Sequence, residues 1–374
     1  MNRRPSQSRT GFDSFSPQHT AHFKAAQPGG EFFEPKPRAS LGRRLLLALL
    51  LLMMITLAVN LAVNQFVRVA RVTVPIRRMD SAFEGYTLLQ ISDLKGATYG
   101  SNQALIRFAL QNEDFDAVVF TGDMVSSRGN AQPLYALIEM LRELKPDAPI
   151  YMIPGDKDPL PASMSYATGG SPFAPWVLGA KQRGGQLLSA PVQIERDGHT
   201  LWLTTSALLS LDMDTMQAQF ERQYLDALAD GDENAIELTT YNLQWLTETR
   251  NARAKMTDAD VYIALTHVPP ADEELESAYP GSLRERVHLV LCGHYQGGLI
   301  RLPFAGALFI PSQNLPLYGL LPGADTYFGL TRKGRTYLYV SPGLGGNDGL
   351  YPLPFFRLFN PPTVSLISLT TSSL

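Results

Sequence analysis

The chain has 374 residues and a formal net charge of −3, which allows one large domain with appendages and gives no overall basic signal for nucleic-acid binding. Cys292 is the single cysteine, so an intramolecular disulfide and a four-cysteine zinc site are excluded. Cys292 also sits in an apolar run, which is typical of a packed, unreactive thiol.

The N-terminal part of the sequence predicts a leader and a membrane anchor. Residues 1–44 are rich in Pro, Gly, Ser, Gln and Arg and lack apolar periodicity, so we expect a disordered leader. Residues 45–64 contain an uncharged apolar run that is long enough to cross a bilayer core of about 30 Å. A cleaved signal peptide is the alternative, but the long leader, the length of the run and the lack of a small-residue cleavage pattern favour an uncleaved anchor.

The basic residues around this run predict its orientation. Arginine and lysine residues flank the run equally at short range, and the further basic residues of the leader favour a cytoplasmic N-terminus. The prediction is a single-pass protein of the cell membrane. Its large domain, residues 66–374, would lie outside the cytoplasm.

After the anchor, short apolar strands alternate with helices. Strands are predicted at residues 67–74, 86–91, 117–120, 149–153, 261–265, 287–292, 337–340 and 363–369. Helices are predicted at 102–110 with Ser101 as N-cap, at 134–144, and over most of 213–256 with a break near 230–233. Residues 159–185 are predicted to form a long surface loop, and 186–205 two strands around a turn at 196–198. The strand–helix alternation predicts an α/β fold.

Five of the strand-like runs end in an acidic residue or a histidine. These residues are Asp93, Asp123, Asp156, His267 and His294. Because the carboxyl ends of strands in an α/β sheet line one edge, these side chains can converge. Three carboxylates and two imidazoles suit zinc, manganese or iron. The alternative is a set of unrelated loop residues, but five such coincidences at one edge favour a site.

Five segments carry a resemblance to a known family. In order, ISDLK, FTGDM, IPGDKD, LTHVPP and CGHYQGGLIRLP resemble the motifs D-x-H, G-D, G-N-H-D, H and G-H-x-H of the calcineurin-like metallophosphoesterases. Residues 301–303 and 341–369 are similar to the membrane-anchored bacterial branch, and the resemblance covers roughly residues 66–370. It implies the metallo-dependent phosphatase fold, with two packed mixed β-sheets flanked by helices and an active site at the carboxyl strand ends.

The resemblance implies that one of two family metal sites is lost. At the first metal, the family positions fall on Asp93, Lys95, Asp123 and Gln296. A lysine ammonium has no lone pair for a metal, and glutamine is a poor ligand for a borderline metal. At the second metal, the family positions fall on Asp123, Asp156, His267 and His294. These four residues predict a site for one divalent ion (Zn, Mn or Fe), with no bound metal as the alternative.

Three cations near these motifs are candidates for substrate contact or catalysis. Lys157 takes the place of the family's phosphate-contacting histidine, and it can hold a phosphate as a point charge. Lys95 could place its ammonium in the vacated first-metal position, and a solvent-facing side chain is the alternative. Arg128 lies near the Asp123 loop and could touch the substrate, although a solvated arginine is the simpler interpretation.

Two functions are consistent with these residues. One is phosphoester hydrolysis at a single-metal site, with a lipid-linked or envelope-derived substrate suggested by the membrane address alone. The other is a catalytically inactive phosphoesterase-fold protein with a binding or regulatory role, because losing three motif histidines should lower the rate by orders of magnitude. The aromatic cluster Phe355, Phe356 and Phe359 could dock on lipid headgroups, but packing against the domain is the favoured interpretation.

Overall fold

The computed structural model describes residues 40–167, 171–276, 283–302, 304–310, 320–323, 327–346 and 357–372. The predicted leader lies outside these ranges except for residues 40–44, and the prediction of disorder was wrong for residues 41–44, which are helical. The chain forms two compact units, Met1–Met53 and Met54–Leu374. The described part of the first unit is almost entirely helical, and its helix α1 (Leu41–Val63) continues into the second unit. Within the described residues, α1 is the one helix long and apolar enough to cross a membrane.

The second unit is built on two six-stranded mixed sheets. The first sheet has the order β1 (Arg68–Arg77), β14 (Thr363–Ser372), β2 (Thr87–Ile91), β3 (Ala117–Thr121), β4 (Ile150–Ile153) and β5 (Gly185–Leu187). Strand β14 is parallel to β1 and antiparallel to β2, and β2 to β5 are parallel. The second sheet has the order β12 (Gly329–Lys333), β13 (Thr336–Val340), β9 (Leu289–Cys292), β8 (Val261–Leu265), β7 (His199–Thr205) and β6 (Val192–Arg196). Its four central strands are parallel, and its two edge strands are antiparallel to their neighbours.

The two sheets face each other across one apolar core. Leu88 and Val119 of the first sheet belong to the same buried cluster as Leu203, Ile263 and Leu291 of the second. The central strands are buried on both faces, which is why they read as short unbroken apolar runs in the sequence. The predicted fold of two packed mixed sheets flanked by helices is therefore confirmed.

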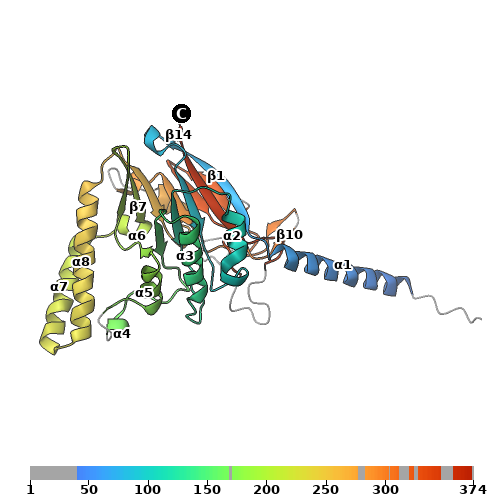
Figure 1. The fold of residues 1–374 in the computed structure, drawn as a ribbon, viewed down its shortest axis with the longest axis horizontal. Helices are drawn as coiled ribbons and strands as arrows, with labels where there is room; N and C mark the ends of the chain where they lie inside the picture. Colours follow the sequence, from blue (N-terminus) through green and yellow to red (C-terminus); the bar gives the residue numbers. More distant parts are fainter. Residues whose placement is uncertain are drawn as a thin grey trace, which may run out of the picture. The chain divides into compact units, whose positions relative to one another are not determined.

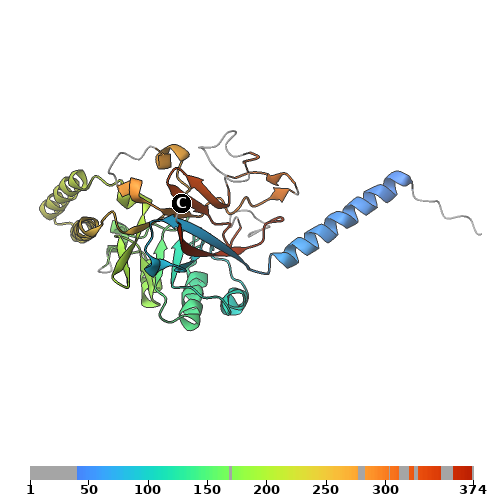
Figure 2. The same ribbon diagram turned by 90° about the horizontal axis from the view of Figure 1, so that it is seen from above.

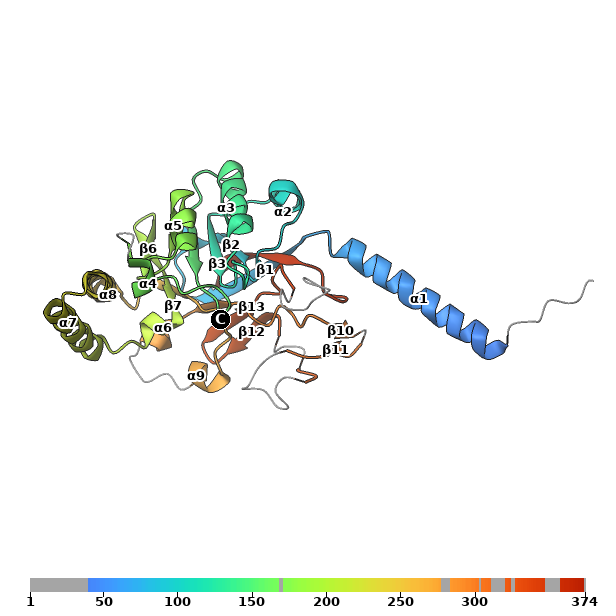
Figure 3. The same ribbon diagram turned by 90° about the horizontal axis from the view of Figure 1, so that it is seen from below.

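Helices cover the outer faces of this sandwich. Helices α2 (Ala104–Leu110), α3 (Gln132–Leu144) and α5 (Pro175–Gln182) lie together on the outer face of the first sheet (Figures 1 and 3). Helices α7 (Met213–Asp230) and α8 (Glu233–Lys255) run side by side at one end of the sheets (Figure 2). Their short connection includes Gly231 at φ 66° and the N-cap Asp232.

Short elements complete the described chain. They are α4 (Met164–Ala167), α6 (Ser206–Leu209), α9 (Asp272–Glu276), η1 (Ser81–Phe83), η2 (Ser101–Gln103), η3 (Leu283–Arg286), β10 (Arg301–Leu302) and β11 (Gly306–Ala307). Strands β10 and β11 form a separate antiparallel pair.

The prediction of one long surface loop over residues 159–185 was wrong. This segment contains α4 and α5 and reaches β5. Trp176, Val177 and Ala180 of α5 are buried in the core cluster shared with α3. The proline at the first turn of α5 is a helix-start signal that the surrounding Gly, Pro and Ser residues obscured.

The predicted helix start at residue 102 was also wrong, because α2 begins at Ala104. Asn102 and Gln103 have φ angles of 51° and 59°, and Ser101 begins the turn η2 without capping α2. The buried Gln103 side chain accepts a hydrogen bond from Tyr99 N at 2.8 Å and donates to Pro133 O at 3.0 Å. These hydrogen bonds, one local and one to the distant Pro133, hold the turn out of the helical conformation.

Candidate metal centre

The five acidic and histidine residues predicted from the strand ends lie at one edge of the sandwich. Asp93, Asp123 and Asp156 follow the parallel neighbours β2, β3 and β4. His267 and His294 follow β8 and β9, which are parallel neighbours in the other sheet. Hydrogen bonds cross between these loops, from Asp93 N to Gly122 O and from Gly293 N to His267 O, both at 3.0 Å. The structure therefore brings all five side chains together.

The loops reach this arrangement through unusual backbone conformations. Five site residues have φ angles in the left-handed region, namely Asp93, Lys95, Asp123, His294 and Gln296. Residues other than glycine rarely adopt this region, and such conformations persist where the surroundings hold them. The loops also pack closely, because a Cβ atom on Gly293 would lie 1.8 Å from Ser92 Oγ.

The hydrogen bond of His267 Nδ1 orients the imidazole ring, so that Nε2 faces the other donors. Its Nδ1 lies 2.8 Å from Thr121 O and must donate there, because a carbonyl only accepts. Its Nε2 then faces Asp156 Oδ1 at 3.0 Å and Asp123 Oδ2 at 3.3 Å. His294 Nδ1 lies 3.3 Å from both Asp156 Oδ1 and His267 Nε2. A backbone partner on one ring nitrogen is how proteins fix the tautomer of a metal-binding histidine.

The charges of this cluster shift its pKa values in opposite directions. Burial acts to lower the pKa of His267, but the carboxylates of Asp123 and Asp156 raise it to about 11. The hydrogen bond from His267 holds the pKa of Asp156 well below its usual range. Burial acts to raise the pKa of Asp123, but His267 and Lys95 outweigh it and lower that pKa. The two carboxylates are therefore ionised and concentrate negative charge around His267 Nε2.

The residues that the resemblance assigns to the first metal contact one another. Asp93 is fully buried, and its Oδ2 accepts hydrogen bonds from Ser92 Oγ at 2.6 Å and His294 N at 3.1 Å. Its Oδ1 accepts from Gln296 Nε2 at 3.2 Å. Lys95 Nζ lies 3.3 Å from Asp123 Oδ2 and 4.0 Å from Asp93 Oδ1. The Lys95 side chain is only 9% exposed, so it does not face solvent.

The other two predicted cations differ in their placement. Lys157 N donates to Asp123 Oδ1 at 2.9 Å, and its Nζ lies 2.9 Å from Asp156 Oδ2 with about half of the side chain exposed. Lys157 thus lies at the open side of the cluster. Arg128 is exposed in the turn that follows the Asp123 loop, and among the described residues no hydrogen bond or ion pair joins it to the cluster.

Three residues that support the site were missed by the sequence analysis. Asp158 accepts from Val125 N at 2.7 Å and Gly155 N at 2.8 Å, which ties the loops after β3 and β4 together, and burial raises its pKa. Arg357 is fully buried and donates to Gln296 O at 2.9 Å, and Asn360 Nδ2 donates to the same oxygen at 2.7 Å. The available signal was the final aspartate of GDKD, and an arginine and an asparagine within the apolar segment FFRLFNPP.

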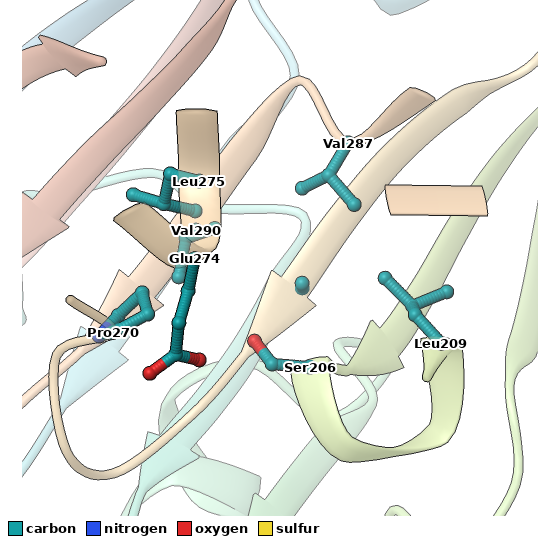
Figure 4. A pocket seen from close by; sticks show the side chains of 8 residues that line it. Ser206, Leu209, Pro270, Glu274, Leu275, Val287 and Val290 are labelled. Carbon is teal, nitrogen blue, oxygen red and sulfur yellow. The ribbon is translucent and has the colours of Figure 1, made fainter. Parts of the chain in front are cut away.

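A small cavity of about 20 Å³ lies beside β8 and β9. Pro270, Glu274 and Leu275 lie on one side of it, and Ser206 and Leu209 on the other (Figure 4). Its size suits about one water molecule. It includes none of the site residues described above, so it has no part in the candidate metal centre.

Comparisons with known proteins identify the family of this chain. A family model described as calcineurin-like phosphoesterase matches residues 86–296, which is more than half of the chain. The chain therefore belongs to the calcineurin-like phosphoesterase family, as its motifs predict. It is 25% identical over 278 residues to YkuE of Bacillus subtilis (strain 168), named an uncharacterized metallophosphoesterase, covering 73% of this chain and 77% of YkuE. The crystal structure of phosphopantetheinyl hydrolase (PptH) from Mycobacterium tuberculosis matches 70% of this chain and 91% of its own, with 12% identity and a TM-score of 0.35.

Proposed function

We propose that this protein is a membrane-anchored phosphoester hydrolase that works with a single divalent ion. The observation that carries the proposal is the convergence of Asp123, Asp156 and His294 on Nε2 of His267. The family implies a divalent metal and a phosphoester substrate. One ion rather than two is our inference from the residues at the two positions.

The donor set at the second position fits a zinc, manganese or iron ion. It offers two imidazole nitrogens and two carboxylates, and the candidate donor atoms of Asp156, His267 and His294 lie within 4.8 Å of one another. Two of these side chains, Asp156 and His294, are partly accessible, whereas Asp123 and His267 are buried. This difference leaves an open side for substrate.

In this proposed hydrolase, Lys95 and Lys157 supply positive charge in place of the first metal ion and the motif histidines that this chain lacks. Lys157 would hold a phosphate oxygen from the open side, exchanging its contact with Asp156 for one with the substrate. Lys95 would neutralise Asp93 and Asp123 from within, and so keep Asp123 available to the ion. When bound, a divalent ion supplies Lewis acidity towards the phosphoester oxygen.

The membrane part of the proposal rests on α1. Its run of apolar residues suits a single span, with the N-terminus in the cytoplasm and the phosphoesterase domain outside it. A domain tethered in this way meets phosphoesters at or near the lipid surface. We therefore propose a lipid-linked or envelope-derived substrate.

A second function is favoured by one specific observation. Lys95 lies beside Asp123 and the amide of Gln296 lies beside Asp93, where the resemblance implies the first metal, and neither can deliver the water-activating chemistry of a second ion. A domain that binds a phosphorylated ligand without hydrolysing it would be consistent with this substitution. The two functions share the second position and differ only in turnover.

Metal stoichiometry and hydrolysis of the purified full chain would test the proposal. We expect about one equivalent of Zn, Mn or Fe in the unsubstituted chain. The double variant Lys95→His, Gln296→His, which restores the family motifs, should bind a second equivalent. Hydrolysis of bis(4-nitrophenyl) phosphate by the unsubstituted chain would support the enzyme, and metal binding without any turnover would favour the second function. If no metal binds under any loading condition, both the single-ion site and the hydrolase are wrong.

A further inference from the structure

A small sheet beside the main sandwich exposes several large apolar side chains. Leu358 pairs with Ile300, β10 pairs with β11, and Phe309 pairs with Leu320, so the segments lie next to one another. We call their exposed side chains the apolar patch, which consists of Leu302, Phe304, Phe309, Leu320, Leu321 and Phe359. Phe304 is fully exposed and the others are between 37% and 58% exposed. Clusters of this kind on a protein surface usually mark a contact with a partner or a membrane.

The end of α1 is hydrogen-bonded to the segment that carries Leu358 and Phe359. Asn60 is buried although it lies in an apolar helix, and its Nδ2 donates to Arg357 O at 2.6 Å. Its Oδ1 accepts from Phe359 N at 2.9 Å. Asn64, just after the helix, also donates to Arg357 O, at 2.5 Å. Both ends of the Asn60 amide are therefore bound by the segment that carries Phe359.

These hydrogen bonds fix the depth of the small sheet if α1 crosses a bilayer. Asn60 lies three residues before the last residue of α1, Val63, which is roughly 5 Å along the helix axis. The apolar run that ends at Val63 is about as long as the hydrocarbon core is thick, so Asn60 must lie near the boundary of that core. The backbone of Phe359, bonded to Asn60, must then lie at the lipid surface as well.

We propose that the apolar patch docks into the interface of the bilayer that α1 crosses. This inference rests on the membrane anchor proposed above. Aromatic and aliphatic side chains at this depth are typical of membrane-surface contacts. Arg68, which is exposed at the start of β1 close after the helix, adds a positive charge suited to anionic headgroups.

Docking would hold the candidate metal centre at a fixed height above the lipid. Arg357 and Asn360, from the segment that Asn60 binds, both donate to Gln296 O in the loop of the metal centre. The chain of contacts from α1 to this loop therefore passes through buried hydrogen bonds at each step. A phosphoester at headgroup depth would meet the domain in one orientation.

The experiment measures the depth of single tryptophan probes. The full chain would be placed in vesicles of lipids with brominated acyl chains, which quench nearby tryptophan emission, and compared with unbrominated vesicles. Phe304→Trp and Phe309→Trp probe the patch, and Leu52→Trp probes the middle of α1. Leu225→Trp is the matched control, because Leu225 is 62% exposed on α7 at the opposite end of the domain from β10 (Figure 3). Emission of the three native tryptophans is subtracted with the unsubstituted chain.

We expect the two patch probes to be quenched at least half as strongly as Leu52→Trp, and Leu225→Trp to be unaffected. Strong quenching of Leu52→Trp with patch probes that behave like Leu225→Trp would overturn the docking proposal and leave the anchor intact. Absence of quenching at Leu52→Trp would overturn the anchor, and the docking proposal with it. The experiment therefore distinguishes failure of the anchor proposal from failure of the docking proposal.

Discussion

Asp93 and Asp156 follow strands of the same sheet, yet their carboxylates lie in different surroundings. Asp93 is fully buried, and its oxygens contact Ser92, Gln296, the backbone of His294 and the ammonium of Lys95. The Asp156 side chain is 38% exposed and faces two imidazoles and the exposed ammonium of Lys157. A buried carboxylate needs its counter-charge built into the fold, because leaving it unpaired is costly.

The comparison gives a physical reason for our proposal that one family metal position is lost while the other stays available. At the first position the chain supplies a cation of its own, so an ion would have to displace Lys95 and Gln296. At the second position a proton on His267 balances the negative charge of the carboxylates, and Nε2 of His267 offers its lone pair once that proton leaves. A proton exchanges with a metal ion more readily than a covalently attached lysine moves away.

The largest expected effect comes from removing the internal cation. Lys95→Met keeps the length of the side chain and removes the ammonium beside the buried carboxylates of Asp93 and Asp123. Although His267 still faces Asp123, the metal-free chain should lose roughly 3 kcal/mol or more of its free energy of unfolding. Lys145→Met is the matched control, because Lys145 pairs with the largely exposed carboxylate of Asp114 and should lose less than about 1 kcal/mol. Urea unfolding of both variants makes the measurement. Equal losses would mean that Lys95 has no special role at the first position.

The second position is tested by removing its central donor. His267→Ala should weaken binding of Zn or Mn by more than ~100-fold, because Nε2 of His267 is the atom on which the other donors converge. His199→Ala is the control, since His199 is half exposed and lies 3.4 Å from Asp80, outside the site. Competition with a chelator gives the two affinities. An unchanged affinity in His267→Ala would place the ion elsewhere.

The sequence predicted the edge of the site well because its signals are local. Each buried strand reads as a short apolar run, and each run ends at a turn that carries an Asp or His. The rule that strand ends share one edge then brings together residues far apart in sequence, from Asp93 to His294. The resemblance to the family motifs then predicts which of these residues belong to which metal position.

The features that could not be predicted from the sequence depend on tertiary contacts. The direction of Lys95 was left open, because it depends on the left-handed backbone at Asp93 and Lys95 and on two carboxylates from different strands. Arg357 and Asn360 were missed because their partner, Gln296 O, is about 60 residues away and is a backbone atom. Helix α5 was missed because its apolar face is short and lies among residues typical of loops.

His288 lies at the other end of β9 from His294. It allows the loss of stability at low pH that comes from a buried neutral histidine to be separated from the loss that comes from the charges of the two metal positions. Burial lowers the pKa of His288 to about 4, and its Nδ1 accepts a hydrogen bond from Tyr262 N. The unfolded chain binds this proton more readily, near pH 6.5, so this contribution to stability is complete above that pH and is lost as the pH falls towards 4. The full difference amounts to roughly 3 kcal/mol, of which a part is seen at pH 5.

His288→Asn keeps an acceptor for Tyr262 N without a titrating ring. Urea unfolding of the metal-free chain at pH 7 and pH 5 should show a smaller loss of stability in this variant than in the unsubstituted chain. If both lose the same amount, the acid sensitivity arises elsewhere, and the charges of the two metal positions become the first candidates.

The smallest expected effect is at the exposed rim of the second position. Lys157→Ala should raise KM for a phosphodiester by about tenfold, because a half-exposed ammonium is screened by solvent and contributes little more than one kcal/mol to binding. Metal affinity should stay unchanged, since Lys157 has no lone pair to offer while charged. Lys181→Ala, on the exposed face of α5, is the control for loss of a surface charge. A change in metal affinity as large as the change in KM would mean that Lys157 organises Asp156 for the ion instead of holding the substrate.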